Sequence, residues 1–232
     1  NARTRDGYGT IRAAIDDAGE GDTIEVLSNG PFEEQVIIRS SVTVKSIGGV
    51  AEITNADKTD ETVSIRASDV ELDGFKIKNT ADEATGAVQA VAVRGDGKPT
   101  SNVRLRNLDI DGSELTLENP DEEDNTSIGL YVRDGSSGRG VDEGDVSNVE
   151  IESIKTSGFD FGVGVATFSG QKISDVEMAD IDATNNGFGL AVVQEAGTIE
   201  PLIGENEFES VLTDNIASVG DLAKDGAFIQ EI

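Results

Sequence analysis

Residues Ser68 to Asn79 read SDVELDGFKIKN, and the pattern of this stretch recurs along the chain. Each clear copy begins with Ser, then Asp or Asn, then Val, with apolar residues two and five places after the Val. Six copies, two of them looser than the rest, have their Val-equivalent positions at Val42, Val70, Val103, Val149, Val176 and Ile203. Spacings of 27 to 46 residues are typical of a stacked repeat architecture. The pattern therefore predicts one elongated all-β domain over residues 1–232, with about six coils.

A second strand is expected ahead of each copy, and four of these strands end in the same way. They are the segments Val36 to Arg39, Val63 to Arg66, Val91 to Arg94 and Leu130 to Arg133. Since side chains alternate along a strand, the first and third residues point inward and the arginine points outward. We therefore expect a row of outward side chains on successive rungs, roughly 5 Å apart, formed by Arg39, Arg66, Arg94 and Arg133.

Two interpretations of this row are open. Four like charges in a line repel one another unless anionic groups lie between them, and Arg binds carboxylate and sulfate groups in bidentate fashion. The row is therefore a candidate ligand-binding groove for an acidic polymer or glycan. Alternatively, outward Asp and Glu side chains on neighbouring strands pair with each arginine. The 46 acidic residues of the chain favour this second interpretation.

Parallel pairing of the copies should stack like residues on like inside the coils. One expected column contains Val70, Val103, Val149 and Val176, and another contains Phe75, Leu108, Ile154 and Ile181. Asn79 and Asn185 fall at matching places in their copies, which predicts a short stack of asparagine amides at a turn. Such a stack would be structural, because amides can bond to one another along the axis of the coils.

The start of the chain adds a family resemblance. Thr10 can cap a short amphipathic helix that Gly19 ends, and strands follow at Thr23 to Val26 and near Val36. This opening resembles that of right-handed parallel β-helix proteins of the pectin-lyase-like class, in which a helix closes the first coil. The resemblance implies a capping helix over 10–19, coils over 23–210, and either a cap or the start of a further segment over 211–232.

The same class includes many enzymes. Its polygalacturonases carry Asn-Thr-Asp, Asp-Asp, Gly-His-Gly and Arg-Ile-Lys motifs, and its pectate lyases use calcium and an arginine base. The present chain has no histidine and lacks the Asn-Thr-Asp and Arg-Ile-Lys motifs. With no His and no Cys, zinc sites, nucleophilic triads and disulfides are also disfavoured. We therefore assign no catalytic residues.

The net charge of the chain limits which partners it can bind. Asp and Glu number 46 against 18 Lys and Arg, and the formal net charge is -28. This charge excludes nucleic acids and anionic membranes as partners, and no apolar run is long enough to span a membrane. Disorder, a calcium-saturated extracellular solenoid and adaptation to molar salt are competing explanations. The third is favoured, because acid is spread over nearly every segment and the composition resembles that of haloarchaeal proteins.

Two acidic, turn-rich insertions interrupt the repeat, at residues 112–126 and 134–145. The first contains Asp121, Glu122, Glu123 and Asp124, a candidate site for calcium or magnesium, which both prefer oxygen ligands. Consecutive acids are more often a solvated loop. Asn125 begins the only N-glycosylation motif of the chain, which points to the cell exterior.

These observations predict a non-catalytic β-helix module of a halophile, extracellular or on the surface of a cell or virion. Its expected role is a rigid spacer that binds a glycan or a surface protein and requires no cofactor. A homo-oligomer, such as a trimeric spike, is a further option. The alternative function is a polysaccharide lyase or glycoside hydrolase acting on an acidic polysaccharide in high salt, by calcium or by paired carboxylates.

Overall fold

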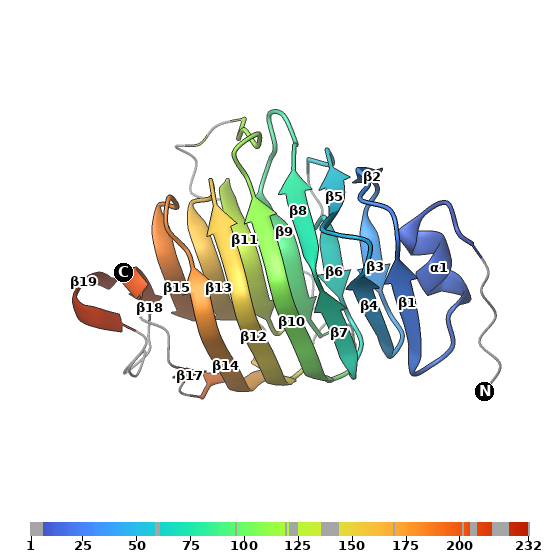
Figure 1. The fold of residues 1–232 in the computed structure, drawn as a ribbon. Helices are drawn as coiled ribbons and strands as arrows, with labels where there is room; N and C mark the ends of the chain where they lie inside the picture. Colours follow the sequence, from blue (N-terminus) through green and yellow to red (C-terminus); the bar gives the residue numbers. More distant parts are fainter. Residues whose placement is uncertain are drawn as a thin grey trace.

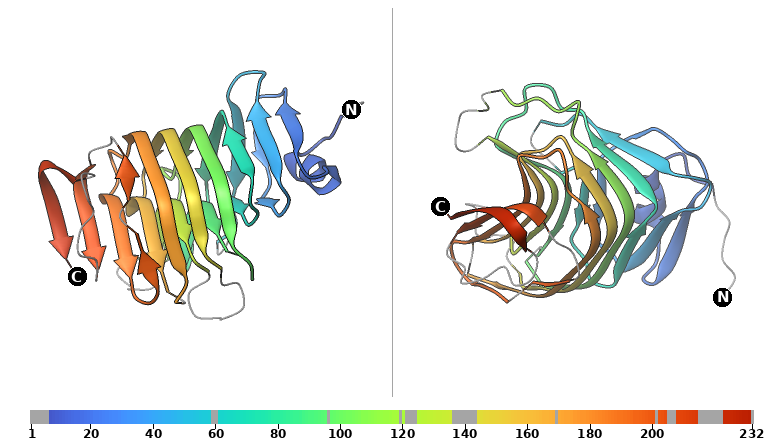
Figure 2. Two further views of the ribbon diagram at one scale, coloured as in Figure 1. Left: turned by 90° about the horizontal axis from the view of Figure 1, so that it is seen from below. Right: turned by 60° about the vertical axis from the view of Figure 1, so that its left-hand side comes forward.

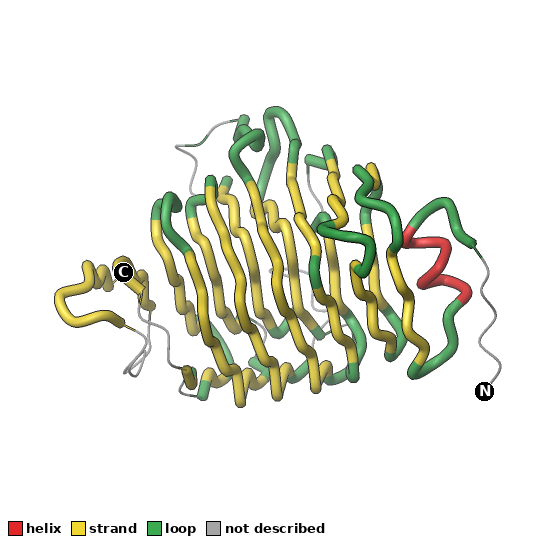
Figure 3. The backbone as a smooth tube through the Cα atoms, in the orientation of Figure 1, coloured by secondary structure: helices red, strands yellow, loops and turns green. Residues whose placement is uncertain are grey.

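The computed structural model describes residues 7–58, 61–95, 97–118, 120, 125–135, 144–168, 170–200, 202–204, 208–214 and 223–231. Strand accounts for 58% of the chain and helix for 4%, so the expected all-β class is confirmed. The strands form two parallel sheets, and the chain passes back and forth between them (Figure 1). Figure 3 shows how little of the described backbone is helical.

The first sheet contains the Val-equivalent positions of all six Ser-(Asp/Asn)-Val copies. Its main order is β1 (Asp22–Val26), β4 (Val42–Ser46), β7 (Val70–Asp73), β10 (Thr100–Asp111), β12 (Val146–Ser157), β14 (Lys172–Asp182) and β16 (Thr198–Ile199). Four shorter strands pair beside this path: β2 (Phe32–Glu33), β5 (Ala51–Asn55), β8 (Phe75–Asn79) and β17 (Ile203–Gly204).

The second sheet contains the strands at whose carboxyl ends the four arginines lie. Its order is β3 (Val36–Ile38), β6 (Val63–Ile65), β9 (Ala87–Arg94), β11 (Thr126–Arg133), β13 (Phe161–Thr167), β15 (Phe188–Gln194), β18 (Phe208–Asp214) and β19 (Ala223–Glu231). The right-hand view of Figure 2 shows strands of successive repeats lying one behind another. One continuous apolar core, with residues from both sheets, fills the space between them.

In β10, β12 and β14 the Ser-(Asp/Asn)-Val element bends a strand instead of preceding one, whereas in the copy at Ser68 it precedes β7 and Gly74 separates β7 from β8. Asp69, Asn102, Asn148 and Asp175 have positive φ angles of 58°, 57°, 52° and 53°. Asp and Asn tolerate this left-handed region better than other residues with a Cβ atom. A second bend recurs five residues later, at Gly74, Asn107, Ser153 and Asp180. The bends explain why simple alternation of apolar residues breaks within each copy.

The expected apolar columns are confirmed by the strand register. Val103 pairs with Val70 and Val149, and Val149 with Val176; Ile154 lies between Leu108 and Ile181. The predicted asparagine stack is wrong, because the register puts Gly112 and Gly158 between Asn79 and Asn185.

The amide ladder lies instead at the first bend. The Nδ2 atom of Asn102 donates to Asp69 at 2.8 Å, and that of Asn148 donates to Asn102 at 2.6 Å.

The two ends of the stack differ. Helix α1 (Ile11–Asp17) covers the first repeat, with Ile11 and Ile15 buried in the core, as expected. Thr10 caps the helix, accepting a hydrogen bond from the backbone nitrogen of Ala13 at 3.1 Å. At the other end, β18 and β19 continue the second sheet to Glu231, past residue 210 where the repeat was expected to end. Backbone pairing continues there without the sequence motif.

Candidate anion-binding site

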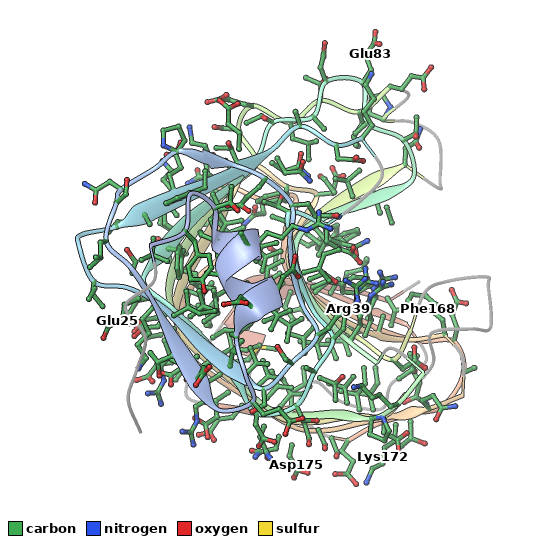
Figure 4. All side chains as sticks on the ribbon, turned by 90° about the vertical axis from the view of Figure 1, so that its right-hand side faces the viewer. Glu25, Arg39, Glu83, Phe168, Lys172 and Asp175 are labelled. Carbon is green, nitrogen blue, oxygen red and sulfur yellow. The ribbon has the colours of Figure 1, made fainter. Side chains whose placement is uncertain are left out.

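The four arginines of the predicted row follow one another on the outer face of the second sheet. Arg94 and Arg133 are direct register partners. Arg66 and Arg39 directly follow the paired residues Ile65 and Ile38, which continue the same register toward the start of the chain. Figure 4 looks along the stack and shows blue nitrogen atoms gathered beside the Arg39 label. The repeat therefore does align these side chains.

The outward direction expected of the four arginines does not bring all of them into solvent. Arg39 is exposed and Arg66 is half-buried, but Arg94 and Arg133 are only 6% and 7% exposed. The outer face of the sheet is itself buried at this point, since Ala92 is fully buried and Tyr131 is 7% exposed. A guanidinium group buried at that depth needs hydrogen-bond acceptors close by.

Glu61 supplies these acceptors to three arginines at once. Its carboxylate Oε1 lies 2.8 Å from Arg133 Nη2 and 3.6 Å from Arg94 Nε. The other oxygen, Oε2, lies 3.5 Å from Arg66 Nη2. The side chain of Glu61 is only 6% exposed. We call Glu61, Arg66, Arg94 and Arg133 the Glu61 cluster.

The charges of the cluster keep Glu61 ionised. Burial by itself would raise the pKa of Glu61, but the nearby positive charges of Arg94, Arg133 and Arg66 outweigh burial and hold the pKa below its usual range. Neighbouring groups also fix the positions of the side chains. Arg66 Nε donates to the hydroxyl of Ser64 at 2.9 Å, and Gln35 donates to the backbone carbonyl of Glu61 at 3.1 Å.

Glu61 leaves one donor of Arg133 without an acceptor among the described residues. Each guanidinium group has five N–H donors, whereas a carboxylate offers about four lone-pair sites. The Nε atom of Arg133 is buried and has no hydrogen-bond partner among the described residues. Arg39, one rung away from Arg66, makes no ion pair with any residue that the structure describes. Arg39, which is exposed beside the cluster, has the donors and the charge to hold an anionic group.

Sequence reasoning found the arginines and missed Glu61. The favoured interpretation was that each arginine pairs with an acidic residue of a neighbouring strand. Instead Glu61, two residues before β6, pairs with arginines of three successive strands. No motif marks Glu61 among the 46 acidic residues. Register alone does not reveal the contact: Val63 pairs with Val91, which places Glu61 opposite Gln89, five residues before Arg94.

The other predicted sites do not join this cluster. Asp121, Glu122, Glu123 and Asp124 lie outside the described residues, and within the described part no group of three or more acidic residues is placed to hold a metal ion. The candidate calcium or magnesium site there stays a prediction. Asn125 accepts a hydrogen bond from the backbone nitrogen of Gly86 at 2.6 Å, and its glycosylation is likewise a prediction.

A shallow hollow on the outer face of the first sheet is a weaker candidate. It has a volume of about 370 Å³ and is lined in part by Glu71, Arg104 and Glu150. Its charges already pair within the protein, with Arg104 Nε 2.8 Å from Glu150 and Lys45 Nζ 3.0 Å from Glu71. Neither Arg104 nor Lys45 is therefore available as an unpaired cation for an anionic ligand at the hollow.

Two further findings concern membrane-spanning helices and similarity to known proteins. Within the described residues, no helix has both the length and the apolar character needed to cross a membrane. Searches with the sequence and the structure found no matching protein-family model, no matching curated protein and no matching solved structure.

Proposed function

We propose that the chain is a right-handed parallel β-helix that acts as a non-catalytic surface module and binds an acidic glycan at the Glu61 cluster. The fold proposal is supported by the parallel pairing of successive repeats in both sheets around one core, and by α1 at the first repeat. The acidic composition is consistent with a module on the surface of a halophilic cell or virion, where it would also be a rigid spacer.

The observation that carries the proposal is the Glu61 cluster itself. Three guanidinium groups surround one carboxylate in a protein whose formal net charge is -28. Arginines that are aligned and partly desolvated bind carboxylate and sulfate groups in charge-assisted hydrogen bonds, which are stronger than neutral ones. Arg39, which is exposed, extends the positive surface by one rung toward α1.

The spacing of the row favours a glycan over an extended peptide. Neighbouring parallel strands lie about 4.8 Å apart, so the arginines repeat at that interval along the stack. An extended peptide brings side chains to the same face only every ~6.7 Å, because alternate residues point away. Its acidic groups would therefore fall between the rungs. A sugar polymer does not have the fixed ~6.7 Å side-chain repeat of a β-strand.

Binding also accounts for Glu61 better than glycoside hydrolysis does. A general acid needs a pKa raised toward the working pH, whereas the arginines hold the pKa of Glu61 below its usual range. Hydrolysis of the common kind also uses two carboxylates. The described residues place one carboxylate in the cluster. Glu61 is therefore suited to orienting the arginines.

Calorimetric titration tests the proposal, with an oligomer of galacturonic acid as the acidic probe and an oligomer of glucose of equal length as the neutral one. The buffer contains about 1 M salt, in which the Debye length is ~3 Å and non-specific attraction between exposed charges is screened. We expect the acidic oligomer alone to bind. Arg133→Gln should weaken binding about tenfold or more, since a hydrogen bond to a charged group contributes ~1.5–3 kcal/mol.

Arg104→Gln, on the first sheet, is the matched control and should bind as the unaltered protein does. Equal affinity for the acidic and neutral oligomers, or equal binding by Arg133→Gln and Arg104→Gln, would refute the proposal. A reducing-end assay on the same samples should detect no cleavage. Cleavage of the acidic oligomer by the unaltered protein would support the enzymatic alternative.

A further inference from the structure

The corner at which the first sheet bends is built differently in the first two repeats. From β7 to β8 the chain turns this corner with the single residue Gly74, and β10, β12 and β14 pass through it as continuous strands (Figure 3). Between β1 and β2 the same corner contains residues 27–31, and between β4 and β5 it contains residues 47–50. Because β1 and β4 are paired, these two loops are neighbours, and they lie near the start of the described chain.

The two loops are held against each other through their backbones. The backbone nitrogen of Gly48 donates to the carbonyl oxygen of Val26 at 3.4 Å. That of Glu52 donates to the carbonyl oxygen of Asn29 at 2.8 Å. Gly48 approaches Leu27 so closely that a Cβ atom on this glycine would overlap the Leu27 carbonyl group. These contacts fix the position of one loop relative to the other.

The loops present apolar side chains to solvent. Leu27, Ile47 and Val50 are 71%, 52% and 62% exposed, and they are three of the four large apolar side chains that are exposed in the described part of the chain. Leu27 and Ile47 directly follow the register partners Val26 and Ser46, so they lie on adjacent rungs. Gly, Asn and Ser supply the backbone conformation that a turn needs, and a turn in water does not require an apolar residue. We call Leu27, Ile47 and Val50 the apolar corner.

The apolar corner also lacks charge. Residues 26–32 (VLSNGPF) and 46–51 (SIGGVA) contain no charged side chain, in a chain in which 28% of the residues are charged. Glu25 and Glu52 flank the two loops and supply a polar rim. Depletion of charge at the centre and polar groups at the rim are typical of protein–protein interfaces. Adjacent exposed apolar side chains indicate an interaction surface, whereas single scattered ones do not.

We infer that the apolar corner binds the same corner of a second copy of the chain, about a two-fold axis. A two-fold contact places one patch against itself. Two chains that each have a net charge of -28 meet with the least repulsion where charge is absent, because like charges that face each other across an interface cost free energy. Molar salt screens the remaining repulsion beyond ~3 Å.

The size of the patch predicts a weak dimer. Three apolar side chains from each copy bury less than the ~1,200 Å² at which stable interfaces begin, so dimers form only at high protein concentration. The inference goes beyond the proposed glycan site, because the apolar corner lies on the first sheet and the Glu61 cluster on the second.

Sedimentation velocity in ~1 M salt tests the inference. We expect the unaltered protein to shift from monomer to dimer as its concentration rises from the micromolar to the millimolar range. Leu27→Asp should weaken the dimer about 100-fold or more, because the two-fold axis replaces two buried apolar side chains by two facing carboxylates. Thr198→Asp is the control and should dimerise as the unaltered protein does. It adds the same charge at an exposed position of β16, at the other end of the first sheet.

A protein that stays monomeric throughout, or equal dimerisation of Leu27→Asp and the unaltered protein, would overturn the inference. Val50→Asp takes the place of Leu27→Asp if circular dichroism shows that variant to be unfolded. If the monomeric protein instead binds neutral phosphatidylcholine vesicles, and Leu27→Asp does not, the corner belongs to a lipid surface and the second copy is wrong. The glycan titration depends on Arg133, so a failed dimer leaves the proposed function standing.

Discussion

Replacing Glu61 by Gln should destabilise the protein far more than replacing any exposed acidic residue. The change keeps the shape of the side chain and removes the only carboxylate that the described residues place among Arg66, Arg94 and Arg133. These side chains are 13%, 7% and 9% exposed, so solvent screens the lost attraction only weakly. Removing one partner of a buried ion pair costs about 3–5 kcal/mol in free energy of unfolding.

Glu71→Gln provides the matched control. Glu71 pairs with Lys45 at 3.0 Å, a geometry as short as those of the cluster, but the two side chains are 21% and 35% exposed. Exposed pairs of this kind contribute about 0–1 kcal/mol. Urea unfolding at a fixed salt concentration should therefore show a large fall in midpoint for Glu61→Gln and a small one for Glu71→Gln, at unchanged slope. Similar losses in the two variants would refute the cluster as a buried, coupled unit.

Three other predictions follow from the same structure. The pKa of Glu61 is lowered below its ordinary value of ~4.3, so its contribution to the free energy of unfolding is complete above pH ~4.3 and is lost as the pH falls through the lowered pKa. In acid titrations followed by circular dichroism, Glu61→Gln should therefore lose less stability than the unaltered protein. Asn102→Ala should cost ~1–2 kcal/mol, because Ala is strained at a φ of 57°, and Asn102→Gly should cost clearly less in urea unfolding; equal costs would argue against backbone strain. Dialysis into dilute buffer should unfold the chain, since a net charge of -28 is then unscreened, and cooperative thermal unfolding there would contradict the salt-adaptation hypothesis.

The sequence predicted the parts of the fold that depend on periodic side chains. The Val70 and Phe75 columns, helix α1 and the alignment of four arginines all follow from residues whose spacing repeats. The asparagine stack was mispredicted because matching places in two copies are not adjacent places in space. Two glycine-bearing repeats, at Gly112 and Gly158, intervene.

The site was less predictable, because its properties depend on what lies across the face of the sheet. The alternation of side chains along a strand predicts that Arg94 and Arg133 point away from the core, but it does not predict that the outer face of the sheet is buried at these positions. Glu61 belongs to no repeat, and one acidic residue among many carries no local signal. Its role depends on three rungs meeting at one carboxylate, which is a property of the stacked strands.

Arginine side-chain NMR spectroscopy tests the central claim most directly, because it locates an acidic ligand on named guanidinium groups. The Nε–H signals are assigned by single Arg→Lys variants and followed while an oligomer of galacturonic acid is added in molar salt. We predict saturable shifts for Arg133, Arg94 and Arg66, with Arg104 and Arg106 of the first sheet unchanged. Shifts confined to Arg104 and Arg106, or none at any arginine, would contradict binding at the Glu61 cluster.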